Sequence, residues 1–225
     1  MKTMLYGIRV QLKMDIRSKT LLVTCYVVPL LFFAIMGGIF TSLMPEAKHT
    51  LIQSMTVMGV SMGALIGVPP SMIEVYSTDI KKMYIANGIP LCFGVIALVV
   101  SAFIHLMIMS IIIFALAPIV FHATIPSNIP LYFITLALFV IVSLTISCVL
   151  GLAVKNQAKL TMYSQVVFLP SIMLSGIMFS AELLPNFLES MGKLFPATWG
   201  YTLLIQKNIE VSTFIPLVFI LIISV

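Results

Sequence analysis

The sequence predicts an all-α polytopic membrane protein with six transmembrane helices, the sixth incomplete in this sequence. The first observation is composition: 61% of the residues are hydrophobic and only 8% are charged, whereas a soluble domain carries about 25% charged residues. The second is that five stretches without Asp, Glu, Lys or Arg are long enough to span a hydrocarbon core, which takes about 20 residues of helix. The expected spans are about 21–40, 51–73, 91–117, 131–154 and 160–179, followed by a short one at 214–225.

The connections between these spans are short. The longest polar connection runs from about Ser180 to Thr213, which leaves no room for a separate water-soluble domain. We therefore expect one transmembrane domain over residues 1–225. The last stretch would rise only about 18 Å as a helix, so we expect it to be the incomplete one.

The basic residues are distributed unevenly between the two sides that alternating spans define. Nine lie on one side: Lys2, Arg9, Lys13, Arg17, Lys19, Lys81, Lys82, Lys155 and Lys159. Only Lys48, Lys193 and Lys207 lie on the other. Because basic loops stay in the cytoplasm, we expect a cytoplasmic N-terminus and an external segment at 180–213. Topology thus accounts for the net charge of +5, and no nucleic-acid partner is predicted.

Residues 1–19 have the pattern of an interfacial amphipathic helix. One stripe is apolar and the stripe beside it is basic. The apolar stripe is Met4, Leu5, Ile8, Leu12 and Ile16, and the basic one is Lys2, Arg9, Lys13 and Arg17. Such a helix lies at the acyl boundary with its basic edge toward lipid head groups. The alternative is a basic flank without a fixed helix.

Proline and glycine mark special positions in three spans. Pro29 in the first span and Pro170 in the fifth each remove a helical hydrogen bond, which predicts kinks. The second span contains Gly59, Gly63 and Gly67, a double G-x-x-x-G that forms a groove for close helix approach. The partner helix could belong to the same subunit or to another one.

The connection after the second span is polar and contains Glu74, Asp79, Lys81 and Lys82. Asn87-Gly88 predicts a turn and Pro90 opens the third span. The residues between Asp79 and Ala86 could form two helical turns against the membrane. A solvated loop that only carries inside-positive charge is the alternative.

The external segment after the fifth span also has a helical pattern. Its apolar residues recur at helical spacing: Leu183, Leu184, Phe187, Leu188, Met191, Leu194 and Phe195. Ser180 can cap the start, Pro185 fits the first turn and Pro196 is expected to stop the helix. Trp199 and Tyr201 suit the outer membrane interface.

The sequence lacks the motifs of several enzyme classes. It has no P-loop, no H-E-x-x-H and no G-x-S-x-G. None of the five complete spans contains an Asp or Glu, which excludes a carboxylate relay built from the spans.

His105 is the only titratable side chain expected inside the membrane apart from Cys and Tyr, and Met107 and Met109 beside it are interpreted as apolar filler rather than metal ligands. We expect no metal site. The three cysteines, Cys25, Cys92 and Cys148, are interpreted as small packing residues.

Several segments occur in a characteristic order. The first segment runs from Ile73-Glu74 through Lys81-Lys82 and is followed by Gly88-Ile89-Pro90. The second runs from Leu174 through Gly176 to Phe179 and is followed by Glu182-Leu183-Leu184-Pro185. The last is Phe195-Pro196-Ala197-Thr198. Together with the basic amphipathic N-terminus, they resemble the permease subunit of ABC-2 type (type V) ABC transporters over the whole chain. Ser180 departs from the pattern, because a proline is common at that position.

The resemblance implies an export permease that binds no cofactor itself and pairs with a separate ATPase subunit, which holds ATP and Mg. Two permeases, identical or different, would form the substrate pathway in the plasma membrane of a bacterial cell. Residues 74–89 would form a coupling helix against the ATPase, with Glu74, Asp79, Lys81 and Lys82 as the contact residues. Short re-entrant outer helices would separate spans five and six, around Gly176, Glu182, Pro185 and Pro196.

Two other classes of function are open to a bundle of spanning helices. A secondary transporter or channel usually needs an intramembrane charge or a broken-helix ion site, and the sequence offers only His105 and the prolines. A membrane-embedded enzyme needs a nucleophile and a base, and no such pair is evident. A path without fixed charge would suit an apolar or amphipathic substrate.

Overall fold

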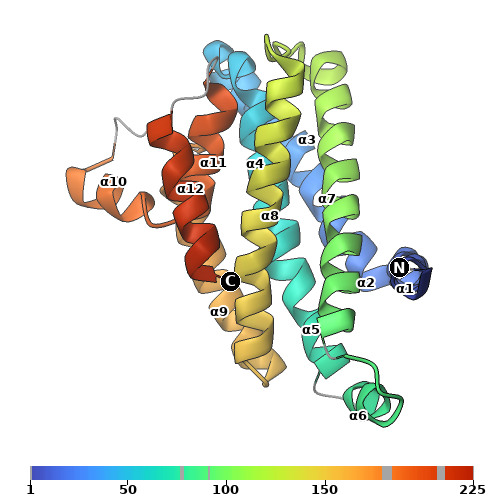
Figure 1. The fold of residues 1–225 in the computed structure, drawn as a ribbon. Helices are drawn as coiled ribbons and strands as arrows, with labels where there is room; N and C mark the ends of the chain where they lie inside the picture. Colours follow the sequence, from blue (N-terminus) through green and yellow to red (C-terminus); the bar gives the residue numbers. More distant parts are fainter. Residues whose placement is uncertain (1, 77–78, 91, 179–183, 207–210, 225) are drawn as a thin grey trace.

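The computed structural model describes residues 2–76, 79–90, 92–178, 184–206 and 211–224, and all regular structure in these ranges is helical. The long helices stand side by side in one bundle, α1 lies across its axis, and α6 projects from one end (Figure 1). The connection between α8 and α9 lies at the same end as α6, and the connections α3–α4 and α7–α8 lie at the other. We call these the α6 end and the far end.

The helical segments follow one another with short connections. In chain order they are α1 (Lys2–Arg17), α2 (Lys19–Leu22), the π-helical η1 (Val23–Val27), α3 (Val28–Leu43), the 3-10 helix η2 (Pro45–His49), α4 (Leu51–Met62), the π-helical η3 (Gly63–Gly67), α5 (Val68–Tyr76), α6 (Asp79–Ala86), α7 (Cys92–Phe121), α8 (Ile129–Ala153), α9 (Gln157–Met173), α10 (Asn186–Gly192), α11 (Pro196–Ile205) and α12 (Val211–Ser224). Of these, α2, η1 and α3 form one continuous rod, as do α4, η3 and α5.

Four helices in the described ranges are long and apolar enough to cross a membrane: Lys19–Leu43, Leu51–Tyr76, Cys92–Phe121 and Ile129–Ala153. The all-α membrane fold is therefore confirmed, whereas the count of six spans is not established by helix length. The expected fifth span is the 17-residue α9, and the expected sixth is the 14-residue α12. The fifth is shorter than predicted because the chain leaves the helix after Met173 and Gly176 adopts a left-handed φ of 83°.

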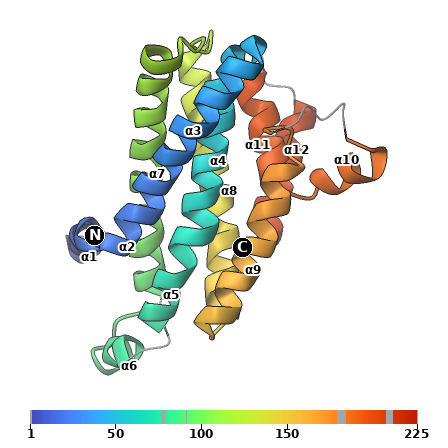
Figure 2. The same ribbon diagram turned by 180° about the vertical axis from the view of Figure 1, so that it is seen from behind.

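The second rod is the centre of the bundle. Of its most apolar stretch, 83% is buried, against 22% for the first rod. Figure 2 shows α4 and α5 between α3 and α9. The glycines of this rod face neighbouring helices of the same chain. A Cβ on Gly59 would lie 2.9 Å from Cε of Met109, and a Cβ on Gly63 would overlap the side chain of Leu106 in α7.

Each of the first two rods contains one π-helical turn ahead of a proline. η1 ends two residues before Pro29, and η3 ends two residues before Pro69. A proline removes a donor and crowds the preceding turn, and a π turn is one way in which a helix absorbs such a defect. The two turns are in contact, since a Cβ on Gly67 would lie 3.2 Å from Sγ of Cys25. The disturbance predicted at Pro29 therefore takes the form of a π turn.

The segment after α9 differs from the predicted long amphipathic helix. The described helix α10 is only seven residues long and begins after Pro185, which stands at its N-cap position. Pro196 does not simply stop a helix: it is the first residue of α11, where its fixed φ and missing N–H suit a helix start. Ser180 and Glu182 lie outside the described residues. α10 extends sideways from the bundle in both views.

Candidate functional site

The helix α6 is the first candidate surface. It spans Asp79–Ala86, the two turns predicted from the sequence. Gly88 has a φ of 65°, the left-handed value that glycine adopts readily. The N–H of Gly88 donates to the carbonyl of Ile85 (3.2 Å) and that of Ile89 to the carbonyl of Tyr84 (2.9 Å), which closes the helix C-terminus.

Among the described side chains of α6, that of Tyr84 packs against the bundle. Tyr84 is half-buried, and a Cβ on Gly94 would lie 3.0 Å from its ring. Gly94 thus lets the first turn of α7 approach the aromatic side chain closely. Lys81 and Lys82 are exposed, and Met83 and Ile85 are each 62% exposed. Lys82 also makes an interaction within the chain. The surface combines basic and apolar side chains, and such a combination is better suited to contact with another protein than to exposure to water.

The acidic residues predicted for this surface are placed differently. Glu74 is exposed on the last turns of α5, not on α6, and it makes an interaction within the chain. Asp79 begins α6, and its side chain lies outside the described part. The described contact surface on α6 therefore consists of Lys81, Lys82, Met83 and Ile85.

A buried carboxylate joins α1 to the bundle, which the sequence did not predict. Asp15 is only 6% exposed. Its Oδ1 accepts a hydrogen bond from Nε2 of Gln11 (2.8 Å), and its Oδ2 accepts one from the hydroxyl of Ser101 in α7. The absence of Asp and Glu from the predicted spans thus does not leave the bundle without a carboxylate, because α1 supplies Asp15 from outside them. The second rod, which continues to Tyr76, also includes the exposed Glu74.

His105 lies one helical turn beyond Ser101 on α7. Its Nδ1 shares a hydrogen bond of 2.7 Å with the hydroxyl of Tyr26 in η1, and the two rings meet edge to face. Its Nε2 is buried without a partner among the described residues. The two neighbouring methionines pack elsewhere. Met107 is half-buried against the core, and Met109 packs at Gly59. This arrangement is a structural contact between the first rod and α7.

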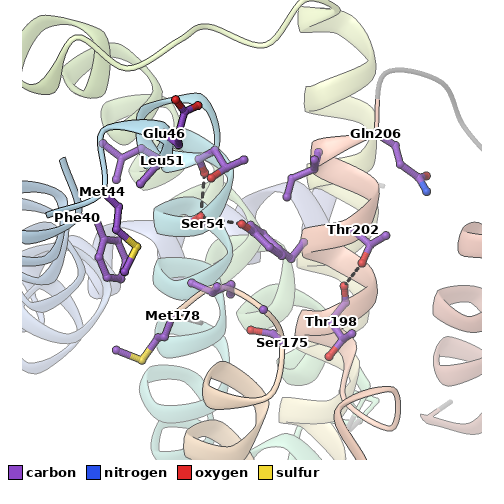
Figure 3. Close-up of a pocket in the computed structure, with 16 residues that line it drawn as sticks. Phe40, Met44, Glu46, Leu51, Ser54, Ser175, Met178, Thr198, Thr202 and Gln206 are labelled. Atoms are coloured by element: carbon purple, nitrogen blue, oxygen red, sulfur yellow. Dashed lines mark hydrogen bonds between the residues drawn. The ribbon is translucent and has the colours of Figure 1, made fainter. Parts of the chain in front are cut away.

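The far end contains the second candidate site, a cavity of about 520 Å³ between the α3–α4 corner, the turn after α9, and α11. Figure 3 shows Phe40, Met44, Ser54, Met178 and Thr202 around it. The hydroxyl of Ser54 donates to the carbonyl of Thr50 (2.8 Å) and lies 3.3 Å from the hydroxyl of Tyr201. The lining combines apolar and hydroxyl-bearing side chains with one carboxylate, Glu46, so it suits an amphipathic guest.

The family model for ABC-2 type transporters matches residues 6–207. The chain belongs to the ABC-2 type transporter family. The match covers both candidate surfaces and the N-terminal helix from residue 6 onward. No curated protein and no solved structure matches the chain.

Membership of the ABC-2 family identifies the chain as a transport subunit rather than an enzyme. It also implies, in general, an ABC ATPase as partner of such a permease. The chain is accordingly a multi-pass membrane protein of an ABC transporter.

The predicted site residues of this ABC-2 permease fall into separate regions. Lys81 and Lys82 lie at the α6 end, Gly59, Gly63 and Gly67 lie in the centre, and Gly176, Pro185 and Pro196 flank the segments around α10. Pro29 and Pro170 are within long helices.

Sequence analysis missed Asp15, Tyr84 and Gly94 as positioning residues. Asp15 had a detectable signal, since it is the only acidic residue in α1 and, at 100° per residue, falls between Met4 and Ile8 within the apolar stripe. Tyr84 and Gly94 had none, because their contact joins two different helices.

Proposed function

We propose that the chain is the permease subunit of an ATP-driven exporter, which works as a dimer of permeases with two separate ATPase subunits. The ATPases bind ATP and Mg, and this chain supplies the substrate pathway. The N-terminus and the α6 end face the cytoplasm of a bacterial cell, and the far end faces outward. The basic asymmetry of the connections supports this orientation.

The observation that carries the proposal is the exposed face of α6 in a chain of this family. A two-turn helix between two long rods is short enough to move as one unit. Tyr84 ties it to α7, and α6 also contacts α5. A push on Lys81, Met83 or Ile85 would therefore reach the base of two spans at once. The chain has no P-loop, so force for transport enters through such a surface.

The far-end cavity fits the exit side of an export path. Its lining comes from α3, η2, α4, the turn after α9, and α11. The nearby α3 and α9 carry exposed apolar side chains, on which a second permease could pack. Closure of the ATPases would tilt the rods and open or close this cavity. An amphipathic or apolar substrate fits the mixed lining.

Co-purification with the proposed ATPase subunit tests the proposal. Lys81→Glu with Met83→Glu places two negative charges on the exposed face of α6 without removing the Tyr84 contact. Lys155→Glu is the matched control, because Lys155 is exposed at the same end but lies on the α8–α9 connection. We expect ATPase recovery to fall at least about tenfold with the α6 variant and to stay normal with the control. The reason is that a charge changed inside an interface lowers the binding free energy more than a charge changed at its rim. Equal recovery of both variants would refute the coupling role of α6.

A further inference from the structure

Another cavity lies between α1, α6 and α7. Its volume is about 550 Å³. Tyr6, Val10 and Met14 of α1 form one wall, Ile89 after α6 forms another, and Phe93 and Ala97 of α7 form the back. The lining is mainly apolar.

A row of positive charge follows the α1 wall of this cavity. Tyr6, Val10 and Met14 are each followed three positions later by a basic residue: Arg9, Lys13 and Arg17. Residues three apart are neighbours on a helix surface, so the three cations stand along the rim. All three are exposed. The single acidic residue of α1, Asp15, is buried and bonded to Gln11 and Ser101, so it does not neutralise them.

An apolar cavity beside a row of cations is complementary to an amphipathic anion. We propose that this cavity binds an anionic phospholipid, with an acyl chain between α1 and α7 and the phosphate at Arg9, Lys13 and Arg17. The site lies beside an amphipathic helix, where acyl chains and head groups meet, and basic clusters at that level attract anionic lipids. A zwitterionic lipid would have the same acyl chain but no net charge on its head group.

The bound lipid would bridge two moving parts. Its chain contacts α1 at Val10 and the turn after α6 at Ile89, so occupancy fixes the distance between the N-terminal helix and the coupling helix. The inference depends on membrane insertion alone and not on the ATPase, so it is tested on the isolated permease.

The measurement is native mass spectrometry of the purified permease with added phosphatidylglycerol or with phosphatidylcholine of the same acyl chains. We expect phosphatidylglycerol to bind preferentially. Val10→Trp fills the cavity and should lower its binding by about fivefold or more. Leu5→Trp is the control, because Leu5 is 66% exposed on the same helix and does not line the cavity. Gel filtration verifies that both variants fold, and Met14→Trp replaces Val10→Trp if that variant does not.

The triple change Arg9→Gln, Lys13→Gln, Arg17→Gln tests the head-group contact. It should lower phosphatidylglycerol binding by roughly tenfold or more and remove the preference over phosphatidylcholine. Equal binding of both lipids to the unmodified chain, or equal effects of Val10→Trp and Leu5→Trp, would overturn the proposal. Loss of ATPase recovery in Val10→Trp with unchanged lipid binding would also overturn it, because the cavity would then be a protein contact.

Discussion

Asp15 shows how one residue outside the spans can determine the position of a whole helix. A carboxylate is rarely buried unless it is bonded, and Asp15 has bonds to Gln11 in α1 and to Ser101 in α7. The bond to Ser101 fixes both the rotation of α1 and its position along α7. The amphipathic pattern alone predicted the helix but not this attachment.

Loss of the Ser101 hydroxyl should loosen α1. Ser101→Ala removes one partner of a buried carboxylate, which costs about 1–3 kcal/mol, and α1 should detach more often. We expect faster trypsin cleavage after the exposed Lys13 and Arg17 in limited proteolysis of the purified protein. Ser110→Ala is the control, since Ser110 is also buried in α7 but donates only to the carbonyl of Leu106 in its own helix. Equal cleavage rates in the two variants would contradict the proposed attachment.

The glycine groove of the second rod is the clearest feature at the scale of elements. The G-x-x-x-G pattern predicted close packing but left the partner open. The structure places Gly59 and Gly63 against α7 and Gly67 against η1, so all three glycines face helices of the same chain. The identity of a partner helix depends on the tertiary arrangement, which a pattern within one helix does not contain.

Gly63→Leu should destabilise the bundle strongly. Its side chain would push into Leu106, and overpacking of a tight contact costs about 1–3 kcal/mol or more. The expected result is a lower aggregation temperature by size-exclusion chromatography after heating. Gly38→Leu should be tolerated, because the only atom within 4 Å of a Cβ there is Cε1 of Phe121, at 3.9 Å.

A rescue experiment separates packing from helix propensity. Leu106→Ala makes room beside position 63, so Gly63→Leu with Leu106→Ala should recover part of the lost stability. A double variant no more stable than Gly63→Leu alone would rule out the Leu106 contact as the cause.

Sequence patterns predicted the elements of this fold better than their ends and their connections. Charge-free stretches located the four long helices within a few residues, and Asn87-Gly88 located the end of α6, because these signals are local. The region from Met173 to Pro196 was predicted less well. There Pro196 starts a helix rather than stopping one, and both roles follow from the same missing N–H. The sequence predicted the helix that carries Lys81 and Lys82, and their contact with an ATPase remains a prediction, whereas the Tyr84–Gly94 contact was not predicted.

At the scale of the whole molecule, the proposed orientation places α6 and the far-end cavity on opposite sides of the membrane. A cysteine at Lys81 should react with an impermeant thiol reagent only after the cells are opened, and one at Asn186 should react in intact cells. Both positions are exposed. The background requires replacement of Cys25, Cys92 and Cys148, since Cys92 is itself exposed. Labelling at Lys81 in intact cells would reverse the orientation.

Energy coupling through α6 is the central claim, and site-specific photocrosslinking tests it most directly. A photoreactive amino acid replaces Ile85, which is 62% exposed on α6, or Leu43, which is 74% exposed at the end of α3. Both sites are exposed aliphatic residues, but they lie at opposite ends of the bundle. After irradiation of cells that also produce the proposed ATPase subunit, we expect a permease–ATPase crosslink from position 85 and none from position 43. A crosslink from position 43, or none from position 85, would contradict the account.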